Sequence, residues 1–217
     1  MLELIRSENL SLAEISENSS FVISKGELVI LLTPKYEVNS ALTRLLVGIE
    51  MPRSGKIFLF NSDTASLSRE ELLHHRRRIG IASGTGGLIS NLKVWENITL
   101  PLYFHYSLSH AEIEERGLAV LNRLGYSENL MALPAHLTFS QRKLVGMARA
   151  MLMTPDIMIY ESPDSGLNQE EKNNFFKIAL EFHREKLERA SILITSNQEV
   201  IRFLPEALVV NLTLVNI

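Results

Sequence analysis

The sequence predicts an α/β fold, because short apolar strands alternate with amphipathic helices along most of the chain. Three runs, 76–83, 155–162 and 190–196, are almost continuous in apolar residues, a pattern typical of buried central strands. Each run ends in small polar residues, and open α/β sheets bind ligands at the carboxyl ends of their strands. The pattern therefore predicts a sheet core and also the edge of that sheet where a site belongs.

Composition supports one folded domain and excludes several classes of function. The chain has 217 residues, of which 46% are apolar, enough to bury a core. It has no cysteine, which excludes disulfides, thiolate metal sites and cysteine nucleophiles. A net charge of -3 gives no electrostatic footprint for nucleic acid. The one basic cluster, His74 to Arg78, is therefore interpreted as a helix end or a local ion-pair partner.

The chain also lacks the patterns of export and membrane insertion. The first sixteen residues mix acids with apolar residues, so no signal peptide is expected. No apolar run approaches the roughly 20 residues that a membrane span requires. We therefore expect a cytoplasmic protein. The strand-like segment 206–217 closes the sequence, and no appended regulatory domain is expected after it.

The first half of the chain predicts three strands and one helix. The strands are expected at 19–24, 26–33 and 55–60, where β-branched and apolar residues predominate. The helix is expected at 40–50, between the last two strands. Its apolar residues are spaced so as to share one face, which we expect to pack in the core: Leu42, Leu45, Leu46 and Ile49.

The middle of the chain, from about 94 to 154, contains several helical patterns and no convincing strand. One helix is expected within 109–125, where Ser109 would cap its start and Glu112 occupies the capping-box position. A longer helix is expected at about 168–188. Its inner face is predicted to carry four apolar residues, Phe175, Ile178, Ala179 and Phe182.

The segment LLTPKYEVNSALTRLL, residues 31–46, has the strand, loop and helix order of a phosphate-binding P-loop. A P-loop needs glycines, because its backbone N–H groups must turn inward around the phosphates, and a lysine that reaches the outer phosphates. This segment has neither the glycines nor a lysine beside its serine. The order of elements therefore predicts a P-loop, whereas the residues within the loop do not.

The whole chain, from about residue 20 to residue 200, resembles an ATP-binding-cassette (ABC) ATPase subunit. The resemblance rests on the order and spacing of a shared framework: Pro34, Gly86, Gly87, Leu88, Glu96, Asn97, Leu137, Gln141, Ala148, Arg149, Ala150, Pro163, Ser165, Gly166 and Leu167. It implies a P-loop NTPase fold, with a RecA-like mixed sheet core, an N-terminal antiparallel β part and an inserted α-helical subdomain. The single domain 1–217 would then comprise a core, 1–92 and 155–217, and a helical subdomain, 93–154.

The family's nucleotide-binding loop would read LLGPSGSGKSTLLRLL over 31–46. Thr33, Tyr36 and Val38 occupy the positions of its glycines, and the β-branched Val38 is especially awkward there. Asn39 replaces the lysine that neutralises the outer phosphates. The degenerate loop as a whole consists of Thr33, Pro34, Lys35, Tyr36, Glu37, Val38, Asn39, Ser40 and Ala41.

The remaining ABC motifs are present in order, and each differs at a residue that the resemblance assigns to chemistry. Gly84 occupies the position of the Q-loop glutamine. Glu161 replaces the magnesium-binding aspartate of the Walker B strand, and Ser162 replaces the general-base glutamate. Ser196 occupies the position of the switch histidine. None of the expected catalytic residues is therefore intact, and a serine has no basicity near neutral pH.

The segment 137–151 resembles the family's LSGGQ signature and the helix after it. The degenerate signature consists of Leu137, Thr138, Phe139, Ser140 and Gln141, with Phe139 and Ser140 in place of the two glycines. In the family's head-to-tail dimers, the signature of one chain covers the ATP bound by the P-loop of the other. A degenerate P-loop therefore leaves room for one working site in a heterodimer and none in a homodimer.

The resemblance thus implies a pseudo-ATPase to which ATP and magnesium bind weakly or not at all. The candidate magnesium ligands are Glu161, acting through a water, and Ser40. An alternative is that the chain still binds and slowly hydrolyses ATP. A second alternative is a soluble ABC-like regulator that works without a permease.

The segment 84–102, GTGGLISNLKVWENITLPL, is similar to the Q-loop region of ATPases of Mce-type, maintenance-of-lipid-asymmetry transporters. That resemblance implies three features: an integral-membrane permease partner, a second nucleotide-binding domain as a homo- or heterodimer, and a peripheral position on the inner face of the cell membrane. Trp95 is the candidate permease-docking residue. A helix-packing tryptophan is the equally weighted alternative.

Overall fold

The computed structural model describes residues 2–11 and 19–212 and contains two sheets. The first sheet has four strands in the order β2-β1-β4-β5, and all its pairings are antiparallel. Its strands are β1 Glu3–Ser11, β2 Ser19–Ser24, β4 Ser54–Leu59 and β5 Ser62–Asp63. The segments 19–24 and 55–60 were both predicted as strands, whereas β1 was not.

The second sheet has five parallel strands in the order β6-β7-β8-β3-β9. Its strands are β3 Leu28–Leu32, β6 Ile79–Ala82, β7 Ile157–Glu161, β8 Ala190–Thr195 and β9 Leu208–Asn211. β7 and β8 are central, as predicted. The prediction of a central strand at 76–83 is wrong, because β6 lies at the edge and only alternate residues of it are fully buried.

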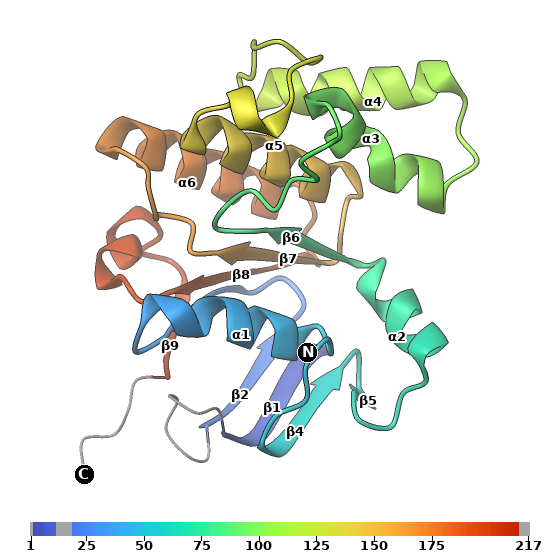
Figure 1. The fold of residues 1–217 in the computed structure, drawn as a ribbon. Helices are drawn as coiled ribbons and strands as arrows, with labels where there is room; N and C mark the ends of the chain where they lie inside the picture. The colour runs from blue at the N-terminus through green and yellow to red at the C-terminus, as the bar shows by residue number, and fades with distance from the viewer. Residues whose placement is uncertain (1, 12–18, 213–217) are drawn as a thin grey trace.

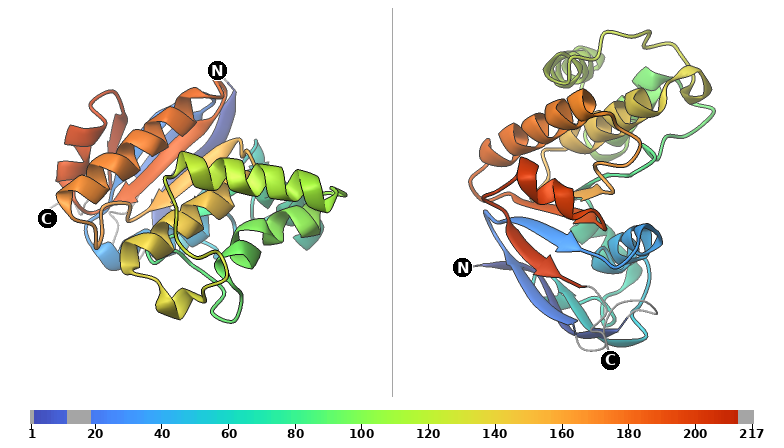
Figure 2. Two further views of the ribbon diagram at one scale, coloured as in Figure 1. Left: turned by 90° about the horizontal axis from the view of Figure 1, so that it is seen from above. Right: turned by 90° about the vertical axis from the view of Figure 1, so that its left-hand side faces the viewer.

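The helices lie in layers around these sheets (Figure 1). Helix α1, Tyr36–Leu46, lies between the antiparallel and the parallel sheet. The opposite face of the parallel sheet is covered by α5, Phe139–Leu152, and α6, Gln169–Arg184. Helices α3, Val94–His105, and α4, His110–Arg123, lie beyond α5 (Figure 2). The shorter α2, Arg69–Arg76, and the 3-10 helices η1, Pro134–His136, and η2, Gln198–Phe203, complete the helices of the described residues.

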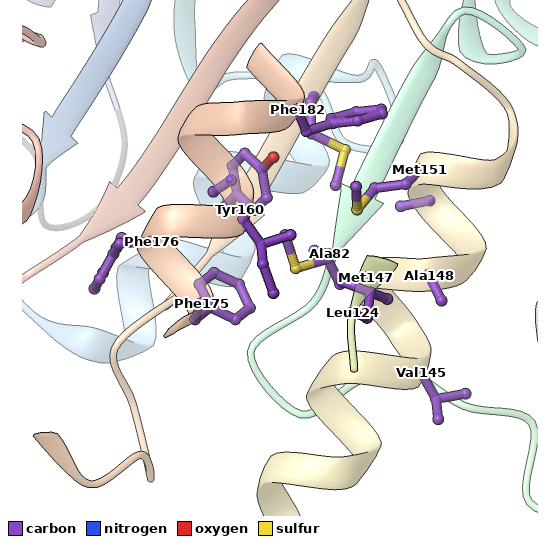
Figure 3. Packing of buried hydrophobic residues seen from close by; sticks show 14 of the residues in the cluster. Ala82, Leu124, Val145, Met147, Ala148, Met151, Tyr160, Phe175, Phe176 and Phe182 are labelled. Atoms are coloured by element: carbon purple, nitrogen blue, oxygen red, sulfur yellow. The ribbon is translucent and has the colours of Figure 1, made fainter. Parts of the chain in front are cut away.

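The parallel sheet separates two hydrophobic clusters. One lies between the sheets and includes Leu42, Leu45 and Leu46 of α1, each at most 1% exposed. The other lies under α5 and α6, where Figure 3 shows Met147 and Met151 of α5 close to the aromatic residues of β7 and α6. Burying an apolar side chain of this size contributes roughly 1.5–3 kcal/mol, so both helices are fixed mainly by these faces.

The capping and inner-face predictions are confirmed for two helices. Ser109 is the N-cap of α4, and it forms a capping box with Glu112. The four predicted inner-face residues of α6, from Phe175 to Phe182, are all buried. The α6 helix ends at Arg184, four residues before the predicted end. No strand lies between β6 and β7, a stretch that the structure describes in full.

Helix α1 differs from the prediction at both ends. It begins at Tyr36 rather than at residue 40, after Lys35 in extended conformation. It ends at Leu46, and Gly48, with φ +67°, turns the chain away from the helix axis. Ile49 is therefore outside the helix and 56% exposed, so its predicted core position is wrong. The spacing of seven residues between Leu42 and Ile49 does not reveal that the helix ends before Gly48.

The basic cluster that ends α2 is committed to structural contacts. Arg76 donates to the carbonyl oxygens of Val47 and Gly48, at the end of α1. Arg78 forms an ion pair with Asp156, with 2.7 Å between Nε and Oδ2. Arg76 thus ends a helix and Arg78 is a local ion-pair partner, the two roles that the sequence suggested for this cluster. Among the described residues, no helix has the length and apolar content to span a membrane.

Candidate functional site

The loops that follow β3, β7 and β8 meet at the carboxyl edge of the parallel sheet. β8 lies between β3 and β7, so their three carboxyl ends are neighbours. Two backbone hydrogen bonds connect the loops, from Thr33 N–H to the Thr195 carbonyl and from Ser162 N–H to the Ile194 carbonyl. The sheet topology thus brings together the segments predicted to carry the site, as expected for an open α/β sheet.

The loop after β3 is short and its backbone does not form an anion nest. It contains only Thr33, Pro34 and Lys35, and the helix begins at Tyr36. A nest needs successive N–H groups in alternating right- and left-handed conformations or in a turn. No residue between 33 and 41 has a positive φ. The backbone from Tyr36 to Ala41 is therefore helical rather than wrapped around a concavity.

Three of the predicted site residues form one buried network. Thr33 Oγ1 donates to Asn39 Oδ1 at 2.5 Å, and Asn39 Nδ2 donates to Ser162 Oγ at 2.7 Å. The three residues are each at most 2% exposed. We call this the Thr33–Asn39–Ser162 network. A buried polar group is stable only when hydrogen-bonded, and here each side chain of the network has its partner within the network.

The candidate magnesium ligands are held by other groups. Ser40 Oγ accepts a hydrogen bond from Arg44 Nη1 at 2.6 Å. Burial raises the pKa of the Glu161 carboxyl, while the Gly84 amide and the charges of Arg44 and Lys143 oppose that rise. Within residues 2–11 and 19–212, no group of three or more His, Cys, Asp or Glu residues is arranged to hold a metal ion. A magnesium ion at this edge would therefore find one carboxylate, that of Glu161, and one hydroxyl, that of Ser40, which already accepts from Arg44.

Gly84 approaches the network closely. A Cβ at this position would lie 3.1 Å from Ser162 Cβ, 3.2 Å from the Glu161 carbonyl oxygen and 3.5 Å from the Tyr36 hydroxyl. Tyr36 is 45% exposed. Its hydroxyl lies near Gly84, on the same side as Ser162 Cβ. A longer side chain at Gly84 would require one of these neighbours to shift.

The residues that connect the loops after β7 and β8 were not predicted from the sequence. Thr195 Oγ1 and Asn197 Nδ2 donate to the two carboxylate oxygens of Asp164, at 2.9 and 2.8 Å. Ser196, the predicted switch position, is exposed beside them. The only signal in the sequence was that polar residues follow both strands. The pairing itself depends on β7 and β8 being neighbours.

The segment 137–141, predicted as the signature, leads into helix α5. Thr138 is the N-cap, and it exchanges two hydrogen bonds with Gln141 in a capping box. Phe139 is half-buried, and its ring lies so close to Gly166 that a Cβ at Gly166 would clash with it. The Ser140 hydroxyl helps to lower the pKa of the Glu171 carboxyl, after the larger effect of the Asn168 amide. Leu137 is buried.

Lys143 is a second buried polar group that sequence analysis missed. Its ammonium donates to the carbonyl oxygens of Ser162, Pro163 and Ser165, at 2.8, 3.0 and 2.9 Å. The residue is 2% exposed. Burial lowers the pKa of Lys143 to about 8, although nearby Asp164 favours its charged form. Lys143 therefore fixes the loop after β7 from the side of α5.

Trp95 lies in the first turn of α3 and contacts α4. A Cβ at Gly117 would lie 2.6 Å from its ring, so Trp95 packs between the two helices. It also lines an open cavity of about 470 Å³ between α3, α4 and the segment after α4. Tyr103, Leu118 and Met131 line the same cavity and are 40–58% exposed. The packing interpretation is confirmed, and docking at this cavity stays a prediction.

Comparison with known proteins identifies relatives over most of the chain. The family model described as "ABC transporter" matches residues 16–165. The methionine import ATP-binding protein MetN 2 of Pseudomonas aeruginosa is 31% identical over 180 residues, covering 83% of this chain and 53% of the relative. The probable ribonucleotide transport ATP-binding protein mkl of Mycobacterium leprae is 25% identical over 194 residues, covering 89% and 56%. The chain thus spans about half the length of these curated relatives.

Solved structures of ABC cassettes have the same fold. CbiO1 from Clostridium perfringens, described as part of the ABC transporter complex cbiONQ, matches with a TM-score of 0.80 and 23% identity, covering 100% of this chain and 88% of that chain. A dimeric structure of the ATP-binding cassette MJ0796 bound to ADP and Pi matches with a TM-score of 0.84 and 24% identity, covering 99% and 97%. The predicted ABC ATPase fold is confirmed.

Proposed function

Because this chain belongs to the ABC transporter ATP-binding family, we propose that it is a pseudo-ATPase subunit of such a transporter. In this proposal it docks on an integral-membrane permease and pairs with a second nucleotide-binding domain, but does not hydrolyse ATP itself. The Thr33–Asn39–Ser162 network carries the proposal. It joins the positions of a P-loop glycine, the phosphate-binding lysine and the general base, and its polar groups are already paired.

A nucleoside triphosphate fits the carboxyl edge of the parallel sheet poorly, for two reasons. Phosphate oxygens need inward-facing N–H groups and a cation, whereas the backbone here is helical from Tyr36 and Asn39 is neutral. To make room for a phosphate, Asn39 would also have to break its two buried hydrogen bonds, with Thr33 and Ser162. Each such bond contributes about 1 kcal/mol, and leaving its groups unpaired costs more.

The fit to hydrolysis is equally poor. Ser162 has no basicity near neutral pH and its hydroxyl accepts from Asn39, so it does not activate a water. Ser40 is engaged by a cationic side chain, which disfavours a metal cation at the same oxygen.

Titration of the purified chain with MgATP tests the proposal. We expect no binding tighter than about 1 mM and no phosphate release above buffer, because neither the phosphate nor the metal has a preorganised site. Isothermal calorimetry and a phosphate-release assay measure the two quantities. The Pseudomonas aeruginosa MetN 2 protein, assayed in parallel, is the positive control.

Micromolar binding together with turnover that is lost in Ser40→Ala would overturn the proposal. That result would favour the alternative, a slow ATPase that uses unusual residues. Ser54→Ala, the same change at an exposed serine outside the loop, serves as the matched control for nonspecific loss of activity.

Pairing with a second nucleotide-binding domain gives such a subunit a role. The MJ0796 cassette is described as a dimer with ADP and Pi. The ABC resemblance implies composite sites in which the signature of the opposite chain covers the nucleotide. Here Ser140 is half-buried at the start of α5, and the helix N-terminus favours anions. Phe139 stands beside it and crowds that surface. Because the loop after β3 in this chain has no preorganised phosphate site, we propose a heterodimer in which the partner domain supplies the competent P-loop.

We propose that the permease docks at the cavity lined by Trp95, Tyr103, Leu118 and Met131, which we call the α3–α4 groove. Exposed apolar residues rim it, as expected for an interface core that is uncovered in the isolated chain. Docking there places the chain at the cytoplasmic face of the membrane. The similarity of 84–102 to Mce-type transporter ATPases is the basis for proposing lipid transport.

Copurification from detergent-solubilised membranes tests this docking. We expect Met131→Glu to reduce the recovered permease about tenfold, because a charge in a dry interface core costs more than 1.4 kcal/mol. The matched control is Met51→Glu, since Met51 is 53% exposed and Met131 is 58% exposed. Equal recovery with both variants contradicts docking at the groove. Mass spectrometry of the recovered membrane protein tests the Mce-type assignment.

A further inference from the structure

An open cavity of about 250 Å³ lies at the edge of the parallel sheet that β6 forms. Among the described strands, β6 pairs only with β7, and Figure 1 shows α2 and α3 on either side of its unpaired edge. We call this space the β6-edge cavity. Its volume is slightly below that of pockets for drug-sized molecules, so it suits a small ligand.

The residues that line the β6-edge cavity include four bases and no acid, and the structure describes all of them. The bases come from three helices. Arg76 ends α2 and Arg77 follows it, His105 ends α3, and Arg149 lies in α5. Since every charged group in the lining is a cation or a histidine, the cavity attracts anions.

Two of the arginines are hydrogen-bonded only to neutral groups. Arg76 donates through Nε and Nη2 to two backbone carbonyl oxygens at the end of α1. Arg149 donates to the carbonyl oxygens of Gly86 and Gly87 and to the side-chain oxygen of Asn97. Burial lowers the pKa of the Arg149 guanidinium. Neutral oxygens hold these side chains in place but leave their charges uncompensated, and each guanidinium keeps N–H groups that these bonds do not use.

The other two bases are available to a ligand. Arg77 and His105 are exposed, and neither side chain has a hydrogen bond, an ion pair or a ring contact with another described residue. Arg78, the next residue, differs in this respect, because it forms an ion pair with Asp156. Arg77 and His105 belong to different helices, so a ligand that contacts both must lie in the β6-edge cavity.

We propose that the β6-edge cavity binds a phosphate monoester. A phosphate monoester carries about 1.5–2 negative charges at pH 7, so it offsets the three guanidinium charges of the lining better than a carboxylate does. Arginine N–H groups also match pairs of phosphate oxygens in geometry. Ile81 and Met153 provide apolar wall beside the cations, where the organic part of the ester would lie. A soluble ester and a lipid headgroup present this same chemistry.

Calorimetric titration of the whole chain with phenyl phosphate, in the absence of magnesium, tests the proposal. We expect saturable one-to-one binding that weakens as sodium chloride is added, because the contacts are between charges. Benzoate, which has the same ring and a single charge, is expected to bind at least tenfold more weakly. No saturable binding of phenyl phosphate, or equally tight binding of benzoate, overturns the proposal.

Vesicles distinguish the two sources of the phosphate. The chain is sedimented with phosphatidylcholine vesicles that contain either phosphatidic acid, a phosphate monoester, or phosphatidylglycerol, a diester with one charge. Recovery with phosphatidic acid alone supports a lipid headgroup as the ligand. Binding of phenyl phosphate without recovery on either vesicle supports a soluble ester. Equal recovery on both vesicles indicates general attraction to anions and contradicts selection of a monoester.

Charge-reversal variants locate the site. Arg77→Glu and His105→Glu each add an acid from a different helix, at exposed side chains without partners, so folding is not expected to suffer. Each should weaken phenyl phosphate binding at least tenfold, whereas Arg202→Glu, at an exposed arginine outside the cavity, leaves it unchanged. Binding that survives both cavity variants overturns the location.

This site is independent of the proposed pseudo-ATPase role. β7 and β8 separate β6 from β3, the strand that leads into the predicted nucleotide loop. Phenyl phosphate bound in the β6-edge cavity should therefore be retained in Ser40→Ala and lost in Arg77→Glu. The opposite pattern would assign the phosphate to the loop after β3 and would contradict the β6-edge site.

Discussion

Replacing Asn39 with lysine, the residue that the ABC resemblance implies at this position, is expected to destabilise this protein by about 3 kcal/mol or more. Asn39 is 1% exposed, and its amide both accepts from Thr33 and donates to Ser162. A lysine cannot accept a hydrogen bond, so the Thr33 hydroxyl would keep only its longer hydrogen bond, 3.3 Å, to the Lys35 carbonyl oxygen. The ammonium would also be buried without a carboxylate bonded to it. Urea unfolding of the variant measures the effect.

Two further variants make this result specific. Glu37→Lys places the same side chain two residues earlier, where the helix surface is exposed, and should cost no more than about 1 kcal/mol. Adding Ser162→Glu to Asn39→Lys supplies a carboxylate and should recover part of the loss, a coupling of about 1.5–3 kcal/mol. An Asn39→Lys protein as stable as the Glu37→Lys protein would contradict the role of the network.

Replacing Lys143 with methionine is expected to cost about 2–4 kcal/mol, because three buried carbonyl oxygens lose their donor. Methionine preserves most of the volume and all of the apolar stem, so lost packing is not the cause. The loop after β7 should also exchange its amide hydrogens faster, since Lys143 binds three of its carbonyls. Lys177→Met, at an exposed position of α6, is the matched control.

The Lys143 ammonium also predicts a pH dependence. Its pKa in the folded protein is about 8, below the value of about 10.4 in an unfolded chain. Between these two pH values the unfolded chain binds more protons than the folded one, so the stability of the native protein rises as pH increases from 8 toward 10. The Lys143→Met variant should lack this rise. A rise of equal size in both proteins would assign it to other groups.

The sequence predicted which segments would meet at the sheet edge but not the contacts between them. The order of motifs placed Glu161, Ser162 and Ser196 at strand ends, and the parallel sheet brings those ends together. Asn39 was predicted in the loop after a strand, and it lies in α1, within hydrogen-bond distance of Ser162. Local sequence cannot report a contact between residues 123 positions apart, such as the one between Asn39 and Ser162. Asp164 and Lys143 were missed for the same reason. Their partners come from other strands and helices.

Some local errors have equally clear physical causes. The start of α1 was predicted four residues late because residues 33–41 were aligned with a glycine-rich loop, although without its glycines the segment is free to be helical. Ile49 was placed in the core because spacing alone does not reveal where Gly48 ends the helix. β6 was predicted to be central because an apolar run does not distinguish an edge strand covered by helices from an inner one.

The sequence by itself determined the α/β class and the ABC family framework. These properties depend on residue type, order and periodicity, which are local. Only the tertiary structure decided that Asn39, Thr33 and Ser162 bind one another, that Lys143 holds the neighbouring loop, and that Trp95 packs against α4 while lining a groove. Such contacts depend on how distant segments pack, because hydrogen bonds and burial are set by neighbours in space.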